Sequence, residues 1–233
     1  MDVSAAAAYS KQVAVMRMYL QAKEYHVALA AMEFAMTWHR GTRKDGVSPE
    51  FSHQMFIAMY VLSITPLLEN PEAVLAAVFL HDVCEDYPVP FDEIERRFGR
   101  EIRDAVECLS KVRDGMRIPD DVYYAQLALN PIASVVKGVD RAHNIHSMHD
   151  ADWTTAKKSD YLRFVSDKVL PMLKAARKLH TRQRFAYENI KAVLLMQARP
   201  VALLLDTEER LVREAGALAE DEGLEAGSEA GPL

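Results

Sequence analysis

Apolar residues recur at helical spacing along most of this chain. Val27, Ala31, Phe34 and Trp38, for example, fall on one stripe of an expected helix. Helices are expected over residues 5–20, 23–39, 52–64, 72–83, 91–98, 101–111, 120–130, 132–149, 154–180 and 181–213. The segment 72–83 is almost uniformly apolar, which predicts a central helix buried on all sides. Because no alternating strand pattern with a hairpin turn is present, the sequence predicts an all-α fold.

Acidic residues and glycines gather at the C-terminal end. Residues 206–233 hold nine acidic residues and two arginines, so the remainder of the chain is close to neutral. We therefore expect a disordered acidic tail over residues 215–233. Ahead of it we expect an N-terminal helix, one domain and a C-terminal helical extension, over residues 1–24, 25–180 and 181–214. Pro171 and Pro200 are expected to kink the last two helices.

Charge and composition exclude several classes of protein. A near-neutral body argues against a broad nucleic-acid footprint. The longest apolar stretch, residues 55–68, is interrupted by polar residues and a proline, and is too short to span a bilayer. The acid at position 2 and the lack of a basic flank do not fit a signal peptide. Two cysteines, Cys84 and Cys108, cannot build a disulfide framework and suit a reducing compartment. We expect a soluble, cytoplasmic protein.

Four ionisable residues directly follow the most apolar helix: His81, Asp82, Glu85 and Asp86. Such groups are costly to bury unless they are paired or bind a metal. His81 and Glu85 are four residues apart, as are Asp82 and Asp86, so each pair shares a helix face. On these residues alone, a helix end that emerges into solvent explains the pattern equally well.

A second carboxylate appears where another apolar run ends. Asp140 follows residues 132–139, and Asn144 lies four residues further on the same helix face. His53 lies near the start of a helix whose next turns are apolar, where an imidazole more often packs or caps than binds a metal. Arg43 and Lys44 lie in a polar loop that, taken alone, is a solvated turn.

Together, His53, His81, Asp82 and Asp140 form a mixed nitrogen and oxygen donor set. Such a set suits a divalent ion such as Mn²⁺ better than a structural zinc site. Three further histidines, His143, His146 and His149, follow at three-residue steps and drift around the helix, so one ion is not expected to bind all three. We expect them at the surface or at a pocket rim.

Six segments in this order carry a resemblance to a known family: WHRGTRKDG (38–46), FSH (51–53), FLHDVCED (79–86), FDEIERRFG (91–99), VECLSK (106–111) and VKGVDRAHN (136–144). They resemble the hydrolase domain of the RelA/SpoT homologues, the alarmone-handling branch of the HD phosphohydrolase superfamily. The resemblance covers roughly residues 25–180 and implies a single-domain HD-type bundle of about eight to ten helices.

The resemblance implies a role for each motif residue. The metal ligands that it implies are His53, His81, Asp82 and Asp140, for one ion per chain that is usually manganese. Glu85 and Asp86 match the pair that orients and activates the attacking water. The residues that match the nucleotide site are Arg43 and Lys44 near the phosphates, Asn144 near the nucleoside, and Lys137 and Arg141, which either support their helix or contact the substrate.

The resemblance also implies the reaction of the family, which is metal-dependent removal of the 3′-pyrophosphate from guanosine tetra- or pentaphosphate with release of GDP or GTP. Phe51 stands where the family usually has Tyr, and residues 145–150 depart from the usual Arg-Thr-Leu pattern. Because the latter region lines the nucleoside pocket, two alternatives stay open: an HD phosphohydrolase for another nucleotide, such as a dNTP or an adenosine alarmone, and an inactive nucleotide-binding module. The expected partner is a small nucleotide.

The expected helix over residues 181–213 has a continuous apolar side. That side could pack back on the domain or form a partner interface, including a homo-oligomer through the C-terminal helix. Only about 55 residues follow residue 178, too few for a synthetase domain of typical size. The sequence is therefore expected to be a stand-alone small alarmone hydrolase.

Overall fold

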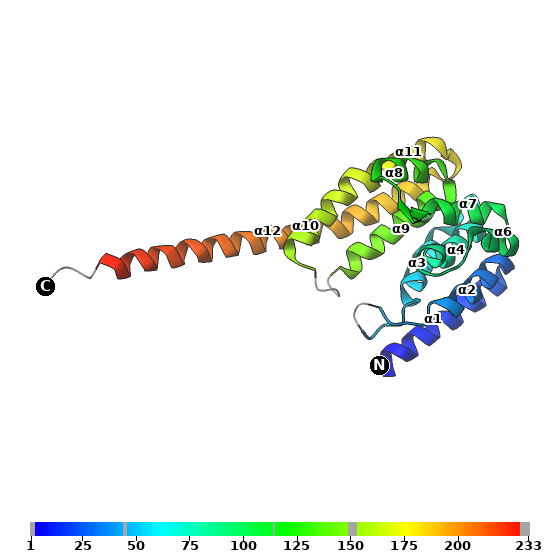
Figure 1. Ribbon diagram of the computed structural model, residues 1–233, viewed down its shortest axis with the longest axis horizontal. Coiled ribbons are helices and arrows are strands. Elements are labelled where there is room, and N and C mark those ends of the chain that lie inside the picture. Colours follow the sequence, from blue (N-terminus) through cyan, green and yellow to red (C-terminus); the bar gives the residue numbers. More distant parts are fainter. Residues whose placement is uncertain (1–2, 44–45, 114, 149–152, 229–233) are drawn as a thin grey trace.

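The computed structural model describes residues 3–43, 46–113, 115–148 and 153–228 (Figure 1). The first half contains α1 (Val3–Ala22), α2 (His26–Trp38), α3 (Ser52–Ile64), a 3₁₀ turn (Thr65–Leu67), α4 (Pro71–Leu80), α5 (Val83–Asp86), α6 (Phe91–Phe98) and α7 (Arg100–Leu109). The second half contains β1 (Val112–Arg113), β2 (Met116–Arg117), α8 (Asp120–Leu129), α9 (Pro131–Ser147), α10 (Thr155–Phe164), a π-helical turn (Val165–Val169), α11 (Leu170–Leu179), a 3₁₀ turn (Thr181–Gln183) and α12 (Arg184–Ser228). The predicted all-α fold is confirmed. None of the described helices combines the length and apolar character needed to cross a membrane.

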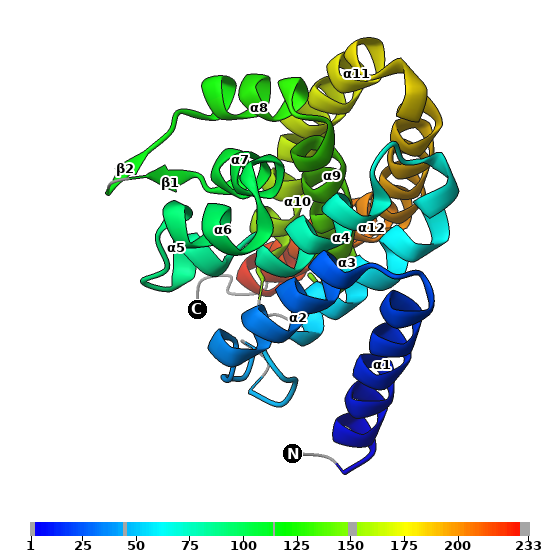
Figure 2. The ribbon, with the colours of Figure 1, turned by 90° about the vertical axis from the view of Figure 1, so that its right-hand side faces the viewer.

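Helix α4 forms the centre of the bundle, as its uniformly apolar sequence predicts. Every residue from Ala73 to Leu80 is buried, and the helix packs against α2, α3, α7 and α9 (Figure 2). Its start is fixed locally, because the Asn70 side chain accepts a hydrogen bond from the Ala73 N–H and Pro71 occupies the first turn. The end of α4 is therefore held rigidly where the ionisable residues begin.

The buried stripe of α2 differs from the predicted one. The structure buries Ala28, Ala31, Met32 and Ala35, whereas Val27 is exposed. Small side chains let α2 approach α4 closely. The bulky Phe34 and Trp38 lie half-buried beside it and contact Phe98 and Tyr87, respectively.

A short hairpin, which the sequence pattern did not predict, joins α7 to α8 at the edge of the molecule (Figure 2). Its strands pair antiparallel, with Val112 opposite Arg117 and Arg113 opposite Met116. Gly115 in the turn has φ = +74°, a conformation that glycine adopts without strain. Two residues per strand are too few to produce a detectable alternating pattern.

Pro171 changes the helical geometry ahead of it. The Leu170 N–H bonds to the Val165 carbonyl in a π-helical turn, five residues back instead of four. This wider turn accommodates a proline ring that would otherwise clash with a carbonyl of the preceding turn. Where a kink was expected at Pro171, the structure has a π-helical turn between α10 and α11.

The C-terminal helix is longer than expected. A disordered tail was predicted from residue 215, whereas α12 is helical to Ser228 and contains Pro200 in its interior. Alanine, glutamate and leucine dominate its last turns, and their high helix propensity accounts for this continuation. In Figure 1, α12 packs on the body and then projects well beyond it.

Candidate active site

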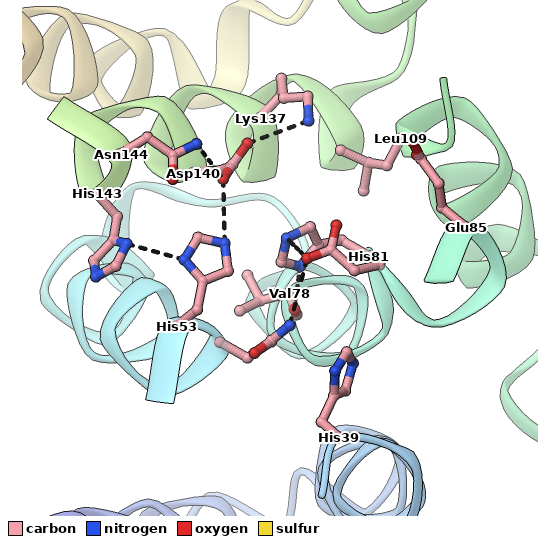
Figure 3. Close-up of polar contacts among 12 residues, drawn as sticks. His39, His53, Val78, His81, Glu85, Leu109, Lys137, Asp140, His143 and Asn144 are labelled. Atoms are coloured by element: carbon pink, nitrogen blue, oxygen red, sulfur yellow. Dashed lines mark hydrogen bonds and ion pairs between the residues drawn. The ribbon is translucent and has the colours of Figure 1, made fainter. Parts of the chain in front are cut away.

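Three residues from two segments of the chain form the candidate metal site, here called the histidine–aspartate cluster: His53, His81 and Asp82. Each offers one ligand atom, and these atoms lie within 4.8 Å of one another. Figure 3 labels His53 and His81 of this cluster, with Asp140 beside them. His53 is the second residue of α3, and the other two directly follow the buried helix α4. His53 and His81 are both buried, so their ring nitrogens require polar or metal partners.

Hydrogen bonding shows which nitrogen of His81 can face a cation. Its Nδ1 lies 2.8 Å from the Val78 carbonyl oxygen, which can only accept. Nε2 is therefore directed into the cluster, 2.9 Å from Asp82 Oδ2. Burial alone would disfavour the imidazolium, but the adjacent Asp82 carboxylate outweighs burial and raises the pKa of His81. An imidazole nitrogen and a carboxylate oxygen this close together are suited to bind one divalent metal ion, and the Val78 carbonyl orients the ring.

Asp140, the fourth predicted ligand, lies beside the cluster on α9. Its Oδ1 is 3.3 Å from His53 Nε2 and accepts a 3.1 Å hydrogen bond from Asn144 Nδ2. Its Oδ2 lies 3.2 Å from Lys137 Nζ and 3.6 Å from Arg141 Nε. Burial opposes ionisation, but the two cations outweigh it and hold the pKa of Asp140 well below its usual range. The carboxylate is therefore a permanent anion with several partners.

Glu85 and Asp86, the predicted water-activating pair, lie on α5 close to the cluster. The Lys111 N–H donates a 3.0 Å hydrogen bond to Glu85 Oε2, which tethers α5 to the chain after α7. Partial burial, together with the negative charges of Asp82 and Glu85, raises the pKa of Asp86 to about 6. A carboxylate with this pKa is a better proton acceptor near neutral pH than an ordinary aspartate.

Two pockets meet at the cluster. The larger has a volume of about 420 Å³ and is lined by Arg43, Phe56 and Trp153 among others. The smaller, about 270 Å³, is lined by three cationic residues and by Glu85. The cationic residues are Lys111, Lys137 and Arg141. Residues common to both pockets are His53, Asp82, Asp86 and Asn144. Lys44, predicted beside Arg43, lies outside the described residues.

His143 is a site residue whose role the sequence did not predict. It lines the larger pocket, and its Nδ1 lies 2.9 Å from His53 Nδ1 while its ring stacks on Phe56. Burial, then the neighbouring His53 and Arg43, lower the pKa of His143 to about 3. The neutral ring can therefore accept the Nδ1–H of His53.

The sequence signal for this role of His143 was its position three residues after Asp140, on the same helix face. His146 also lines this pocket, whereas His149 lies outside the described residues.

Glu50 is a second such residue, and it organises the loop that leads to α3. Its Oε1 accepts a 2.8 Å hydrogen bond from the Tyr87 hydroxyl, and its Oε2 accepts one of 3.1 Å from the Gly41 N–H. Partial burial opposes ionisation, but these hydrogen bonds outweigh it and lower the pKa of Glu50. Tyr87 follows α5 directly, so this contact ties the Arg43 loop to the segment that carries Asp86.

Part of this chain matches a known protein family. Residues 31–122, which include the histidine–aspartate cluster, match the family model described as an HD domain. The match runs from α2 to the first turn of α8 and covers less than half of the chain. Asp140 lies after the matched HD segment, on α9.

Several known proteins are similar in sequence to part of this chain. The "GTP pyrophosphokinase rsh" of Brucella melitensis is 31% identical over 126 residues, which cover 51% of this chain and 16% of that protein. The "guanosine-3′,5′-bis(diphosphate) 3′-pyrophosphohydrolase MESH1" of Xenopus tropicalis is 27% identical over 151 residues, 60% of this chain and 82% of that protein. The chain thus spans about one sixth of the length of the first relative and most of the second.

A solved structure shares the fold of this chain. It is described as "A metazoan ortholog of SpoT hydrolyzes ppGpp and plays a role in starvation responses". The TM-score is 0.54 at 21% sequence identity, with 70% of this chain and 93% of that chain covered. At this level of identity the likeness concerns the helical architecture around the HD motif.

Proposed function

We propose that this chain hydrolyses guanosine 3′,5′-bis(diphosphate) and its pentaphosphate relative, and releases pyrophosphate from the 3′ position. The observation that carries the proposal is the histidine–aspartate cluster at the junction of two pockets, with Asp86 beside it. Asp86 has a pKa of about 6, and cationic residues line the smaller pocket. The named activity of the Xenopus relative, which this chain covers over most of its length, supports the same reaction. Such a substrate would place the protein in the cytoplasm.

The metal we propose is Mn²⁺, one ion per chain, held by His53, His81, Asp82 and Asp140. Imidazole nitrogens and carboxylate oxygens form the mixed donor set that suits this ion. When bound, a divalent ion lowers the pKa of a coordinated water and polarises a phosphoryl oxygen. The hydrogen bond from His81 Nδ1 to the Val78 carbonyl orients the imidazole. The cations Lys137 and Arg141 keep the Asp140 carboxylate ionised.

The chain itself supplies the proton acceptor. As the water oxygen forms its bond to phosphorus, the bond from phosphorus to the ribose 3′ oxygen breaks, and that oxygen takes up a proton from solvent to become the 3′-hydroxyl. The attacking water loses a proton. Asp86 is the group we propose to accept it, since its pKa of about 6 leaves the carboxylate ionised but basic at neutral pH. Glu85, tethered by the Lys111 N–H, keeps α5 in position and adds negative charge that favours proton uptake by Asp86.

The two pockets divide the substrate. The larger one offers aromatic surfaces from Phe56 and Trp153 for a base, together with Arg43 for phosphate. In the smaller one, Lys137 and Arg141 would neutralise phosphoryl oxygens next to the cluster.

A second candidate substrate is a nucleotide with another base or phosphate pattern. The observation that favours it is the lining of the larger pocket by His146 and Ser147. These residues belong to the segment that departs from the family pattern, so base selection can differ while the cluster and the hydrolytic step stay the same.

Product analysis by anion-exchange chromatography tests the proposal. Purified protein with Mn²⁺ is incubated with ppGpp, pppGpp, ppApp and the common dNTPs. GDP plus pyrophosphate from ppGpp, blocked by a chelator, is expected. Asp82→Asn should lose both metal and turnover, whereas Glu85→Gln should keep the metal and lose rate. Turnover of a dNTP alone would move the function to nucleotide-pool control, and no turnover with metal bound would leave a binding module.

A further inference from the structure

Helix α12 carries two separate apolar stripes. The first packs on the body, with Ile190, Leu194, Val201 and Leu205 buried. The second is exposed and is made by Met196, Leu203, Leu204 and Leu211. At 100° per residue, the centres of the two stripes lie about 120° apart around the helix. The second stripe is therefore not an extension of the first, and its burial needs another surface.

This exposed stripe is large for a helix in water. Met196 is 73% exposed, Leu203 60%, Leu204 57% and Leu211 56%. Exposed apolar side chains that gather on one face of a helix are typical of an interaction site. Part of the stripe lies where α12 projects beyond the body (Figure 1), so a partner helix can approach it there.

Charges beside the stripe identify the partner. Arg199 and Asp206 are both exposed and are seven residues apart, so they lie on the same flank of the stripe. When two identical helices pair antiparallel about a two-fold axis, residues on the same flank meet. An axis close to Leu203 sets Arg199 of each copy beside Asp206 of the other, which gives two ion pairs.

The same register aligns the apolar residues. Leu203 lies next to Leu203 of the second copy, and Met196 of each copy packs towards the Leu211 end of the other. A parallel, in-register pair would bring opposite flanks together and would place Arg199 near Leu204, away from a carboxylate. The surface is thus complementary to itself in one direction only.

We propose that this chain forms a homodimer in which the α12 helices of two copies pair antiparallel through Met196, Leu203, Leu204 and Leu211. Such an interface is isologous, because the same patch is used by both copies and the assembly closes at two. It lies outside both pockets of the candidate site and does not depend on the proposed reaction.

Sedimentation velocity of the full chain over a range of concentrations tests the dimer. The wild-type protein is expected to be dimeric at about 100 µM, and Leu203→Glu is expected to be monomeric there, since the charge would be buried twice across the axis. Leu129→Glu is the matched control: this leucine of α8 is 68% exposed and lies outside the stripe, so this variant should remain dimeric. A monomeric wild-type protein, or a dimer that survives Leu203→Glu, overturns the proposal.

Charge exchange tests the antiparallel register. Arg199→Glu and Asp206→Arg should each weaken dimerisation about tenfold, because each places like charges together at two symmetric positions. The double variant should recover wild-type affinity, since the pairs are restored with reversed polarity. Glu209→Arg, on the side of α12 away from the stripe, changes the net charge as Asp206→Arg does and should leave the affinity unchanged. Failure of the double variant to recover would overturn the antiparallel register.

Discussion

The role of Asp140 can be separated into metal binding and charge compensation by one substitution, Asp140→Asn, studied in metal-free protein. If Asp140 served only as a metal ligand, its neutralisation would relieve repulsion from Asp82 and stabilise the folded chain without metal. The structure predicts the opposite sign. The Asp140 side chain is 5% exposed and contacts Lys137, which is 9% exposed, and Arg141, which is 19% exposed.

The magnitude follows from these contacts. Removal of one partner from a buried ion pair costs about 3–5 kcal/mol, because the remaining charge loses its compensation. Here the asparagine amide oxygen can still accept the Asn144 hydrogen bond, and the smaller pocket admits solvent to Lys137 and Arg141. We therefore expect Asp140→Asn to lower the free energy of unfolding by about 2–3 kcal/mol. Urea unfolding at pH 8 in the presence of a chelator measures this change.

Asp86→Asn is the matched control and should change stability in the other direction. An acid whose pKa is raised in the folded state binds protons more readily there than in the unfolded chain. Its ionisation therefore reduces stability as the pH rises through about 6. At pH 8 the asparagine variant escapes this loss, so a higher urea midpoint than wild type is expected. An unchanged or raised midpoint for Asp140→Asn would refute the charge-compensation role.

Three further outcomes follow from the same geometry. Turnover should fall about tenfold per pH unit on the acid side of the pKa of Asp86, because protonation removes this base. A bound cation lowers that pKa below about 6, so a pH–rate profile with no acid limb at any pH at which the protein stays folded would contradict this. Gly138→Ala should destabilise the chain by about 1 kcal/mol in urea unfolding, because a Cβ there would lie 2.8 Å from Ile190 Cγ2 and this overpacking exceeds the gain in helix propensity; a more stable variant would refute the close approach. His143→Ala should weaken metal binding about tenfold by calorimetry, since His53 loses the acceptor of its Nδ1–H; unchanged affinity would show that this contact does not orient His53.

Local sequence signals were sufficient for most of the helices and for the ionisable residues that follow α4, whereas His53 was assigned to the cluster only through the family resemblance. Helix α4 could be predicted because eight successive apolar residues of high helix propensity are typical of a helix that is buried on all sides. The ionisable residues that follow it are close together in the sequence, so it could be predicted without knowledge of the fold that they also lie close together in space. The partners of His53 and Glu50 were different, since these contacts join segments far apart in the chain and depend on how α3, α5 and α9 cross. Such contacts are decided by tertiary packing, which the spacing of apolar residues along the sequence does not predict.

The apolar core and the polar site are mechanically one unit. The C-terminus of a helix carries partial negative charge, which favours a cation. Helix α4 ends at Leu80, and the next residue is His81, whose Nδ1 bonds to the carbonyl of Val78 in the last turn of this buried helix. A ring anchored in this way is held by the packing of α4, which contacts four other helices. The burial of α4 therefore fixes the position of the ionisable residues that directly follow it.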